Sequence, residues 1–331
     1  MTATARASEE LLTERRRSYS EIALRATDWV MPVGTALLMA YFAVVTSQFM
    51  TFENLTAIAT QNAHVFTVAV VAAMLLMAGY ADLSVGSVMA LAGVASGLAF
   101  LALGFVPGIL VGLAVGLGAG LANGLFIGYW NFSPIVVTLG MLAAARGLAQ
   151  FLAPGSLFGF PDAVGDFGSG TIAGISYLVL IAAIIIVVCM SVMTLLPVGR
   201  HIIATGVNRR AAYLSGVDVK RLILVLYAAT GAAAGLAGVL QVARLNSAPS
   251  SSLGLSFEVT VLTAILLGGI AFTGGRGSIW RVVLGVWLIG MLNNGLTLMN
   301  VGVEVSGIVT GVVLIIAAAL EAARSTIRAR I

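Results

Sequence analysis

Long apolar runs recur along almost the whole chain and decide what it can fold into. Each run is close to the ~20 residues that a helix needs to cross a lipid bilayer. We expect ten membrane spans, near residues 30–48, 60–79, 85–103, 106–129, 134–153, 175–196, 222–243, 257–273, 280–299 and 303–321. The sequence therefore predicts an all-α integral membrane protein with about ten transmembrane helices.

The amino-acid composition agrees with this prediction and excludes several other classes of protein. Of the 331 residues, 60% are hydrophobic and only 9% are charged. An ordinary soluble domain has roughly 25% charged residues. The mean hydropathy is +1.08, and too few polar side chains are present to cover a soluble globule of this size. A soluble enzyme, a nucleic-acid-binding domain and a disordered protein are therefore excluded.

The distribution of basic residues predicts how the chain lies in the membrane. Cytoplasmic loops of membrane proteins carry an excess of Lys and Arg. If the amino terminus is inside, the basic segments 1–29, 197–221 and 322–331 are all cytoplasmic, and segment 154–174, which has no basic residue, is outside. We therefore predict cytoplasmic tails at 1–29 and 322–331, and a transmembrane domain at 30–321 with a cytoplasmic loop at 197–221.

The reactive side chains argue against chemistry within this chain. The single lysine, Lys220, does not follow a glycine as the lysine of a phosphate-binding loop does. Cys189 is the only cysteine, and His64 and His201 are far apart in the sequence, so no disulfide or metal site is suggested. We expect no catalytic residue, metal or cofactor here. No hydrophilic stretch is long enough for a motor or a soluble receptor, which would be separate chains.

One predicted span carries glycines at every fourth position, at residues 112, 116, 120, 124 and 128. Small residues at this spacing form one helix face and let two helix backbones approach closely. The face fits either close packing within the chain or a flexible pore helix, and we expect packing. Shorter faces of the same kind occur at Gly231 with Gly235, and at Gly307 with Gly311.

The cytoplasmic loop contains a short segment that predicts a docking helix. Asn208 is placed to cap a helix of about two turns, which Ser215 and Gly216 would end. Such a helix has little to bury by itself, so it would dock into a groove of another protein or lie along the membrane face. We expect its exposed apolar residues to be Ala211, Ala212 and Leu214.

Several polar residues interrupt the apolar runs. A charge at membrane depth is costly unless it is paired or faces water. Asp82 or Ser84 could cap the following helix and order the loop, or could act in a transport path or in gating. Arg146 belongs either to a buried structural network or to a pathway. Glu258 begins a predicted span and is expected at its outer end.

The sequence motifs together resemble those of one family of transport proteins. DLSVGS at 82–87, the segment 208–219, GGRGS at 274–278 and LNNGL at 292–296 are similar to motifs of the membrane permeases of ribose-type sugar ABC importers. FENL at 52–55 fits the same family. The resemblance extends from about residue 30 to residue 320, with the motifs in the family's order.

The resemblance implies a fold, partners and site residues. The fold would be an inverted-repeat bundle, and two permease subunits, identical or different, would form the pathway. Cytoplasmic ATPases holding ATP and Mg²⁺ would dock on it, and a periplasmic sugar-binding protein would deliver the solute. The implied coupling helix contains Asn208, Arg209, Arg210, Ala211, Ala212, Leu214, Ser215 and Gly216. A second cytoplasmic contact would contain Gly274, Gly275, Arg276 and Gly277.

The resemblance also frames the remaining candidates. Asn293 and Asn294 could bond a sugar or a neighbouring helix, and we expect the helix. The candidates for the pathway or for gating are Asp82, Ser84, Arg146, Asn293 and Asn294. Related permeases serve pentoses, deoxyhexoses, polyols and autoinducer-2, so the family does not fix the sugar.

Three hypotheses for function follow. We expect a permease subunit of an ABC importer in the bacterial inner membrane, with both termini cytoplasmic, that moves a small sugar or sugar-like solute by alternating access. It would not be an enzyme by itself, because partner ATPases would hydrolyse the ATP. The alternatives are an ion-coupled transporter that uses Asp82 as its coupling carboxylate, and a membrane scaffold that moves no solute.

Overall fold

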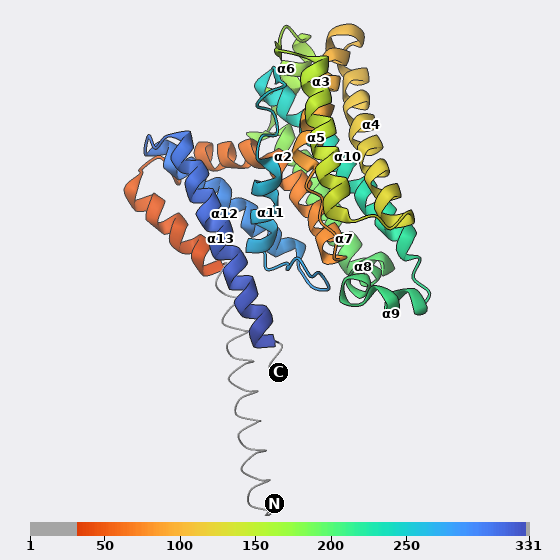
Figure 1. Cartoon of the computed structure of the whole chain (residues 1–331). Coiled ribbons are helices and arrows are strands. Elements are labelled where there is room, and N and C mark those ends of the chain that lie inside the picture. Colours follow the sequence, from red (N-terminus) through yellow and green to blue (C-terminus); the bar gives the residue numbers. More distant parts are fainter. Residues whose placement is uncertain (1–31, 329–331) are drawn as a thin grey trace, which may run out of the picture.

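The computed structural model describes residues 32–328. The predicted tail 1–29 and the last three residues of the predicted tail 322–331 lie outside the described residues. Figure 1 shows a bundle of helices, with α8 and α9 at one end and α6 at the other. The four strands of the described part have two residues each, and β1 (Ser156–Leu157) pairs with β4 (Ala248–Pro249), as β2 (Thr171–Ile172) pairs with β3 (Ile175–Ser176).

Seven helices of the described part are long and apolar enough to cross a membrane. They are α2 (Phe52–Met77), α3 (Val85–Leu103), α4 (Phe105–Gly124) with the π-helix η1 (Leu125–Tyr129), α5 (Pro134–Leu152), α7 (Tyr177–Leu195), α10 (Val219–Leu245) and α12 (Ile279–Leu298). Three shorter apolar helices are Pro32–Val45, α11 (Phe257–Leu267) and Glu304–Ala319 within α13 (Val303–Arg328). The all-α membrane architecture is therefore confirmed, while the count of ten spans and the inverted repeat stay predictions.

Local sequence signals explain where several helices begin and end. Thr51 caps α2 by accepting the backbone N–H of Asn54 at 3.2 Å. Asp218 caps α10 in the same way, accepting from Arg221 at 3.1 Å. α11 ends at Leu267, sooner than the predicted span, because two glycines follow it and Gly269 has a φ of +78°. The predicted boundary at residue 321 falls inside α13.

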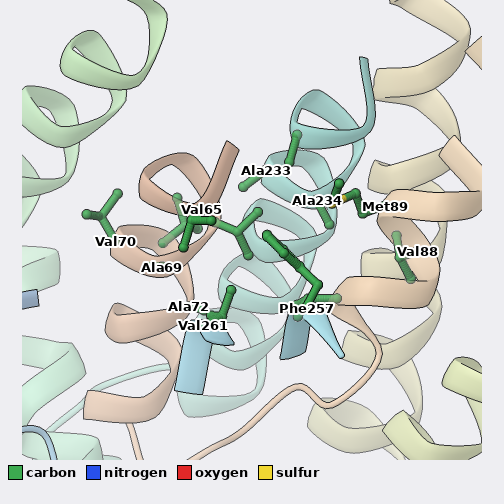
Figure 2. Close-up of a cluster of buried hydrophobic side chains, with 14 of the residues drawn as sticks. Val65, Ala69, Val70, Ala72, Val88, Met89, Ala233, Ala234, Phe257 and Val261 are labelled. Atoms are coloured by element: carbon green, nitrogen blue, oxygen red, sulfur yellow. The ribbon is translucent and has the colours of Figure 1, made fainter. Parts of the chain in front are cut away.

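The core of the bundle lies around α2. From Val65 to Met77 every residue of this helix is buried, as expected for a helix that is apolar on all sides. Figure 2 shows buried side chains of α2, α3, α10 and α11 meeting in one cluster. The labelled members are Val65, Ala69, Val70 and Ala72 of α2, Val88 and Met89 of α3, Ala233 and Ala234 of α10, and Phe257 and Val261 of α11.

The glycine face of α4 packs directly on α10. A Cβ atom added at Gly116 would lie 2.6 Å from the Cα of Gly235, and one added at Gly120 would lie 3.0 Å from the Cα of Gly231. Additions at Gly231 would in turn meet the backbone of α4. The two backbones therefore touch where side chains would otherwise separate them. The predicted close packing is confirmed for this face.

The chain between α10 and α11 is not helical and runs along α3, with part of its residues buried and part exposed. We call residues 246–256 the inserted segment. Its contacts descend α3 in order, with Ala248 beside Gly97, Leu253 beside Gly93 and Gly254 beside Gly86. Non-helical backbone inside a membrane bundle is tolerated only where protein or water surrounds it. The inserted segment therefore places the start of α11 beside the first turn of α3, away from the end of the bundle that carries α6.

Candidate functional site

The predicted docking helix is present at one end of the bundle. α8 (Pro197–Val207) leads directly into α9 (Arg209–Leu214), which Figure 1 shows at the end of the bundle opposite α6. The side chain of Asn208 accepts the backbone N–H of Ala211 at 3.0 Å. The helix ends at Ser215, and Gly216 follows with a φ of +88°. The cap and the end that the sequence indicated are therefore confirmed.

The exposed face of α9 differs in one residue from the expected face. Ala212 is only 4% exposed and packs into the core, so its predicted exposure is wrong. Tyr213 and Leu214 are 68% and 73% exposed. Ala211 is also exposed. The apolar face available to a partner is therefore Ala211, Tyr213 and Leu214, and the tyrosine was not singled out from the sequence.

Basic side chains surround this face. A hollow of about 490 Å³ between α9 and the start of α10 is lined by Arg209, Arg210, Tyr213, Asp218, Val219 and Lys220. Arg209 donates through Nη1 to the side-chain oxygen of Asn131 at 2.9 Å, which ties α9 to the chain that follows η1. Three basic groups and one carboxylate line the hollow, so its local charge is positive.

The glycine-rich turn at residues 274–277 connects the α8–α9 end to the core helix. Gly275 donates its backbone N–H to the carbonyl oxygen of Met77, the last residue of α2, at 2.7 Å. Gly274 and Gly275 have φ values of +71° and +79°, which favour glycine. A Cβ atom added at Gly206 in α8 would meet both Met77 and Gly275. The turn therefore packs between the ends of α2 and α8, and its residue Arg276 is exposed.

Asp82 lies in the linker between α2 and α3 and is hydrogen-bonded on both oxygens. Its Oδ1 accepts the backbone N–H of Ser84 at 2.8 Å and the hydroxyl of Ser84 at 2.5 Å. The amide of Asn123 in α4 donates to Oδ2 at 3.5 Å and to the Ser84 hydroxyl at 3.1 Å. Burial raises the pKa of Asp82, and the hydrogen bonds from Ser84 and Asn123 act against this shift.

The contacts of Asp82 and Ser84 show that the predicted capping of α3 is wrong, whereas the predicted ordering of the loop is present. Ser84 is the N-cap residue of α3, but neither its side chain nor that of Asp82 accepts an N–H of the helix proper, so the predicted capping is wrong. The loop is nevertheless ordered, because Asp82 is tied to α4 through Asn123 and the hydroxyl of Tyr227 donates to the carbonyl of Ala81 at 2.9 Å. Asn123 was not recognised from the sequence as a partner, since it is 41 residues away.

Arg146 holds the inserted segment in place. Its two terminal nitrogens donate to the carbonyl oxygens of Leu253 at 2.7 Å and of Gly254 at 3.0 Å. These two bonds form a structural network of the kind that the sequence analysis considered, and the pathway role of Arg146 stays a prediction. Glu258 lies next to Gly86 in the first turn of α3 and not at an outer end of the bundle, because the inserted segment carries the start of α11 inward.

The two adjacent asparagines of α12 have different environments. Asn294 is buried and exchanges two hydrogen bonds of 3.0 Å with Asn54 in the first turn of α2. The expected contact with a neighbouring helix is confirmed for Asn294. The side-chain oxygen of Asn293 is buried but has no hydrogen-bond partner among the described residues, so the same expectation fails for Asn293.

Asn293 instead lines a hollow of about 530 Å³ between α11, α12 and α13. We call it the polar groove. Its lining residues are Leu255, Ser256, Val259, Thr260, Asn293, Thr297, Ser306, Gly307, Thr310 and Gly311. No sequence pattern indicated this groove, because its hydroxyl-bearing residues come from α11, α12 and α13 and are far apart in the chain. None of its lining residues is charged.

Comparison with known proteins decides the family. A family profile described as a permease component of branched-chain amino acid transport systems matches residues 54–318. The D-allose transport system permease of Escherichia coli K12 is 32% identical over 290 residues, covering 86% of this chain and 89% of the relative. The ribose import permease of Bacillus subtilis is 31% identical over 322 residues, covering 96% and 99%. The chain belongs to the sugar ABC importer permease family.

Other members of this family confirm its breadth. The autoinducer 2 import permease of Escherichia coli O9:H4 is 33% identical over 255 residues, covering 73% of this chain and 76% of the relative. No solved structure matches the chain. Family membership and the apolar helices together make the chain a multi-pass protein of the bacterial inner membrane.

Proposed function

We propose that this permease imports a small, neutral sugar or sugar-like solute, driven by ATPase subunits that dock on α9. The observation that carries the proposal is the exposed pair Tyr213 and Leu214, surrounded by basic side chains at the end of the bundle. An apolar helix face that is left uncovered in a folded chain favours a partner groove. Arg210 and Lys220 would complement acidic residues at the rim of that groove.

The basic residues at the α8–α9 end of the bundle support an orientation of the proposed importer in the membrane. The basic residues Arg200, Arg209, Arg210, Lys220 and Arg221 all belong to α8, α9 and the start of α10. The positive-inside rule supports a cytoplasmic position for this end. Both termini would lie on that side, and α6 would face the periplasm, where a sugar-binding protein would deliver the solute.

The contacts of the glycine-rich turn suggest how an ATPase movement would reach the core. A displacement of α9 would move the end of α8 at Gly206, which packs against Gly275 and Met77. Met77 ends α2 and leads into the linker that Asp82 ties to α4. Two permease subunits would alternate between inward-open and outward-open states in this way. The chain itself makes and breaks no covalent bond, and ATP with Mg²⁺ would bind the partner.

The first experiment is purification of the tagged permease from native membranes in mild detergent. We expect a P-loop ATPase at a comparable amount. Leu214→Asp should reduce the recovered ATPase by at least about tenfold, because it puts a charge into an apolar docking groove. Phe158→Asp is the matched control, since Phe158 is 65% exposed in the predicted outer loop. An ATPase recovered equally with both variants would refute docking on α9.

The ion-coupled alternative has one observation in its favour, which is the burial of Asp82 and its raised pKa. A buried carboxyl group with a raised pKa could take up a proton and couple transport to a proton gradient. Asp82→Asn separates the hypotheses, because the amide keeps an oxygen for the N–H of Ser84 but cannot titrate. Under our proposal the purified complex retains ATP-dependent uptake in liposomes. Loss of uptake together with a proton-gradient dependence of the wild type would favour ion coupling.

A further inference from the structure

The polar groove between α11, α12 and α13 has the composition of a solute path. Six of its lining side chains carry a hydroxyl or an amide group, and none is charged. They are Ser256, Thr260, Asn293, Thr297, Ser306 and Thr310. The volume of about 530 Å³ falls in the range of roughly 300–1,000 Å³ that is typical of small-molecule sites.

The position of the groove makes contact with lipid unfavourable. α12 is a candidate membrane span, and the part of α13 that lines the groove belongs to an apolar helix. The groove also includes the start of α11, which the inserted segment carries into the bundle. Thr297 and Ser306 lie in the last turn of α12 and the first turn of α13, whereas Asn293 and Thr310 lie further inside these helices. Polar groups inside membrane helices are costly unless they meet water or protein. Helices that break at membrane depth are a feature of solute sites in transporters.

The hydrogen bonds of the groove determine what it can recognise. The hydroxyl groups of Thr260, Thr297 and Thr310 donate to backbone carbonyls one turn earlier, at 3.5, 2.8 and 2.9 Å. Their donors are thereby used within the helices, while oxygen lone pairs remain available. The side-chain oxygen of Asn293 has no partner among the described residues. The groove therefore presents acceptors at these positions beside the donors of Ser256, Ser306 and the Asn293 amide, and a matching solute carries groups that both donate and accept, as hydroxyl groups do.

The charges around the groove disfavour an amino acid. A zwitterion needs groups of both signs, and the lining residues carry no charge. The start of α11 could attract a carboxylate through its helix dipole, but Glu258 already occupies its first turn and interacts with Arg146, so neither charge is left for a solute. A neutral solute rich in hydroxyl groups remains. This solute class agrees with the sugars in the names of the relatives and not with the amino acids in the description of the family profile.

We propose that the polar groove is a wall of the sugar pathway, where Asn293, Thr297 and Thr310 accept hydrogen bonds from hydroxyl groups of the passing solute. This inference rests on the proposed import function and adds its contact residues. Gly307 and Gly311 leave space on the same wall, because a Cβ atom added at either would meet nothing within 4 Å in the described chain.

Access of water to the groove is the decisive test. In a Cys189→Ala background, the substitutions Thr297→Cys and Thr310→Cys are made in the full complex in nanodiscs. The charged reagent 2-(trimethylammonium)ethyl methanethiosulfonate serves as the probe, because it needs an ionised thiol in water. Ile308→Cys and Val312→Cys are matched controls, since both residues are exposed, lie on α13 and point away from Thr310.

We expect the two groove cysteines to react at least about tenfold faster than the controls, since a thiol in lipid ionises poorly. Equal, slow reaction of all four would overturn the proposal by making the groove lipid-facing. Spontaneous disulfide links between two copies through Thr297→Cys or Thr310→Cys, without reaction with the probe, would overturn it by making the groove a packed subunit contact. Both readouts are independent of which sugar is carried.

Transport measurements then test the hydrogen bonds. Uptake is measured with D-ribose, D-allose and L-arabinose, and the sugar that the wild-type complex moves fastest is used. Thr297→Val and Asn293→Leu should each raise the KM by about fivefold, the effect of one lost hydrogen bond. Thr194→Val on α7 is the control, since its hydroxyl makes the same bond, at 2.7 Å to Met190.

The outcomes separate the inference from the function on which it rests. An unchanged KM in both groove variants would refute sugar contacts at these residues, even where the complex transports normally. Absence of uptake of all three sugars by a wild-type complex that contains its ATPase would contradict import of these sugars, whereas the thiol reaction would still decide whether the groove is a water-filled path.

Discussion

Glycines spaced by four residues occur on both α4 and α13, but within residues 32–328 only those of α4 are covered by another helix. Additions at Gly116 or Gly120 would collide with the backbone of α10. Additions at Gly307 or Gly311 would meet nothing within 4 Å. The same spacing therefore forms a close helix–helix contact between α4 and α10, which we call the seam, and part of the open lining of the polar groove on α13.

The residues that accompany each glycine face explain this difference. The face of α4 meets the small residues of α10 over several turns, and the contact is between backbones and apolar groups. The face of α13 continues into hydroxyl groups at Ser306 and Thr310, and Asn293 lies across from them. Apolar contact favours closure of a seam, whereas unpaired acceptors favour an occupant with hydrogen-bond donors. Glycines four residues apart therefore predict a helix face of small residues, but the residues around that face determine whether it packs on another helix or stays open.

Gly116→Leu should break the closed seam and have the largest effect. The new side chain would meet the backbone of Gly231 and Gly235, which cannot move aside as a flexible side chain can. We expect a loss of more than about 3 kcal/mol of unfolding free energy, measured in mixed micelles. Gly118→Leu is the matched control on the same helix, because Gly118 is exposed with nothing within 4 Å. Equal destabilisation by both variants would show that the seam is not the cause.

Arg146→Lys should loosen the inserted segment, which leads to the start of α11 at the polar groove. Lysine keeps the positive charge but lacks the planar group that donates to Leu253 and Gly254 together. We expect a loss of about 2 kcal/mol of unfolding free energy, with faster proteolysis within the inserted segment. Arg210→Lys is a control at an exposed site and should leave stability unchanged. Protection of the inserted segment in Arg146→Lys would argue against this anchoring role.

Asn294→Ala and Asn293→Ala should differ although the residues are adjacent. Asn294→Ala removes a reciprocal pair of hydrogen bonds and leaves Asn54 without that partner. We expect a loss of about 1–2 kcal/mol of unfolding free energy. Asn293→Ala removes an acceptor that bonds nothing in the described chain, and should change stability by less than about 0.5 kcal/mol. A larger loss of thermal stability in Asn293→Ala than in Asn294→Ala would contradict the hydrogen bonds assigned to these two residues.

Gly311→Leu should have the smallest effect on stability and sharpen the comparison with Gly116→Leu. Nothing lies within 4 Å of the new Cβ atom, and leucine favours a helix more than glycine does by about 1 kcal/mol. We expect unchanged or slightly higher thermal stability together with reduced uptake, because the side chain would fill part of the polar groove. A destabilisation similar to that of Gly116→Leu would show that this face is covered in the assembled permease.

Much of the fold could be predicted because each long membrane helix is a run of apolar residues that is visible in the sequence. Apolar runs gave the positions of the long helices, since every backbone polar group in lipid must be bonded within a helix. The Asn208 cap and the break at Gly216 depend only on neighbouring residues and were correct. The glycine face of α4 was also assigned correctly, because five glycines on one side of a helix allow another helix backbone to approach closely over several turns.

The remaining features depend on which residues meet across long sequence distances. Asn123 supports Asp82, and Asn54 pairs with Asn294 over 240 residues, so no local pattern indicates either contact. Asn293 and Asn294 differ because successive helix residues point about 100° apart. Hydropathy likewise could not show that the chain before α11 descends along α3. The expected outer position of Glu258 failed for that reason.

The seam between α4 and α10 also sets the order of events during synthesis. Gly120 and Gly231 are about 110 residues apart in the chain, so a ribosome adding about 5–20 residues per second needs roughly 6–22 s to make the second helix after the first. For that time α4 is in the membrane without the neighbour that covers its glycines. The insertion machinery or lipid must occupy this face, and the bundle closes only when about two thirds of the chain has been translated.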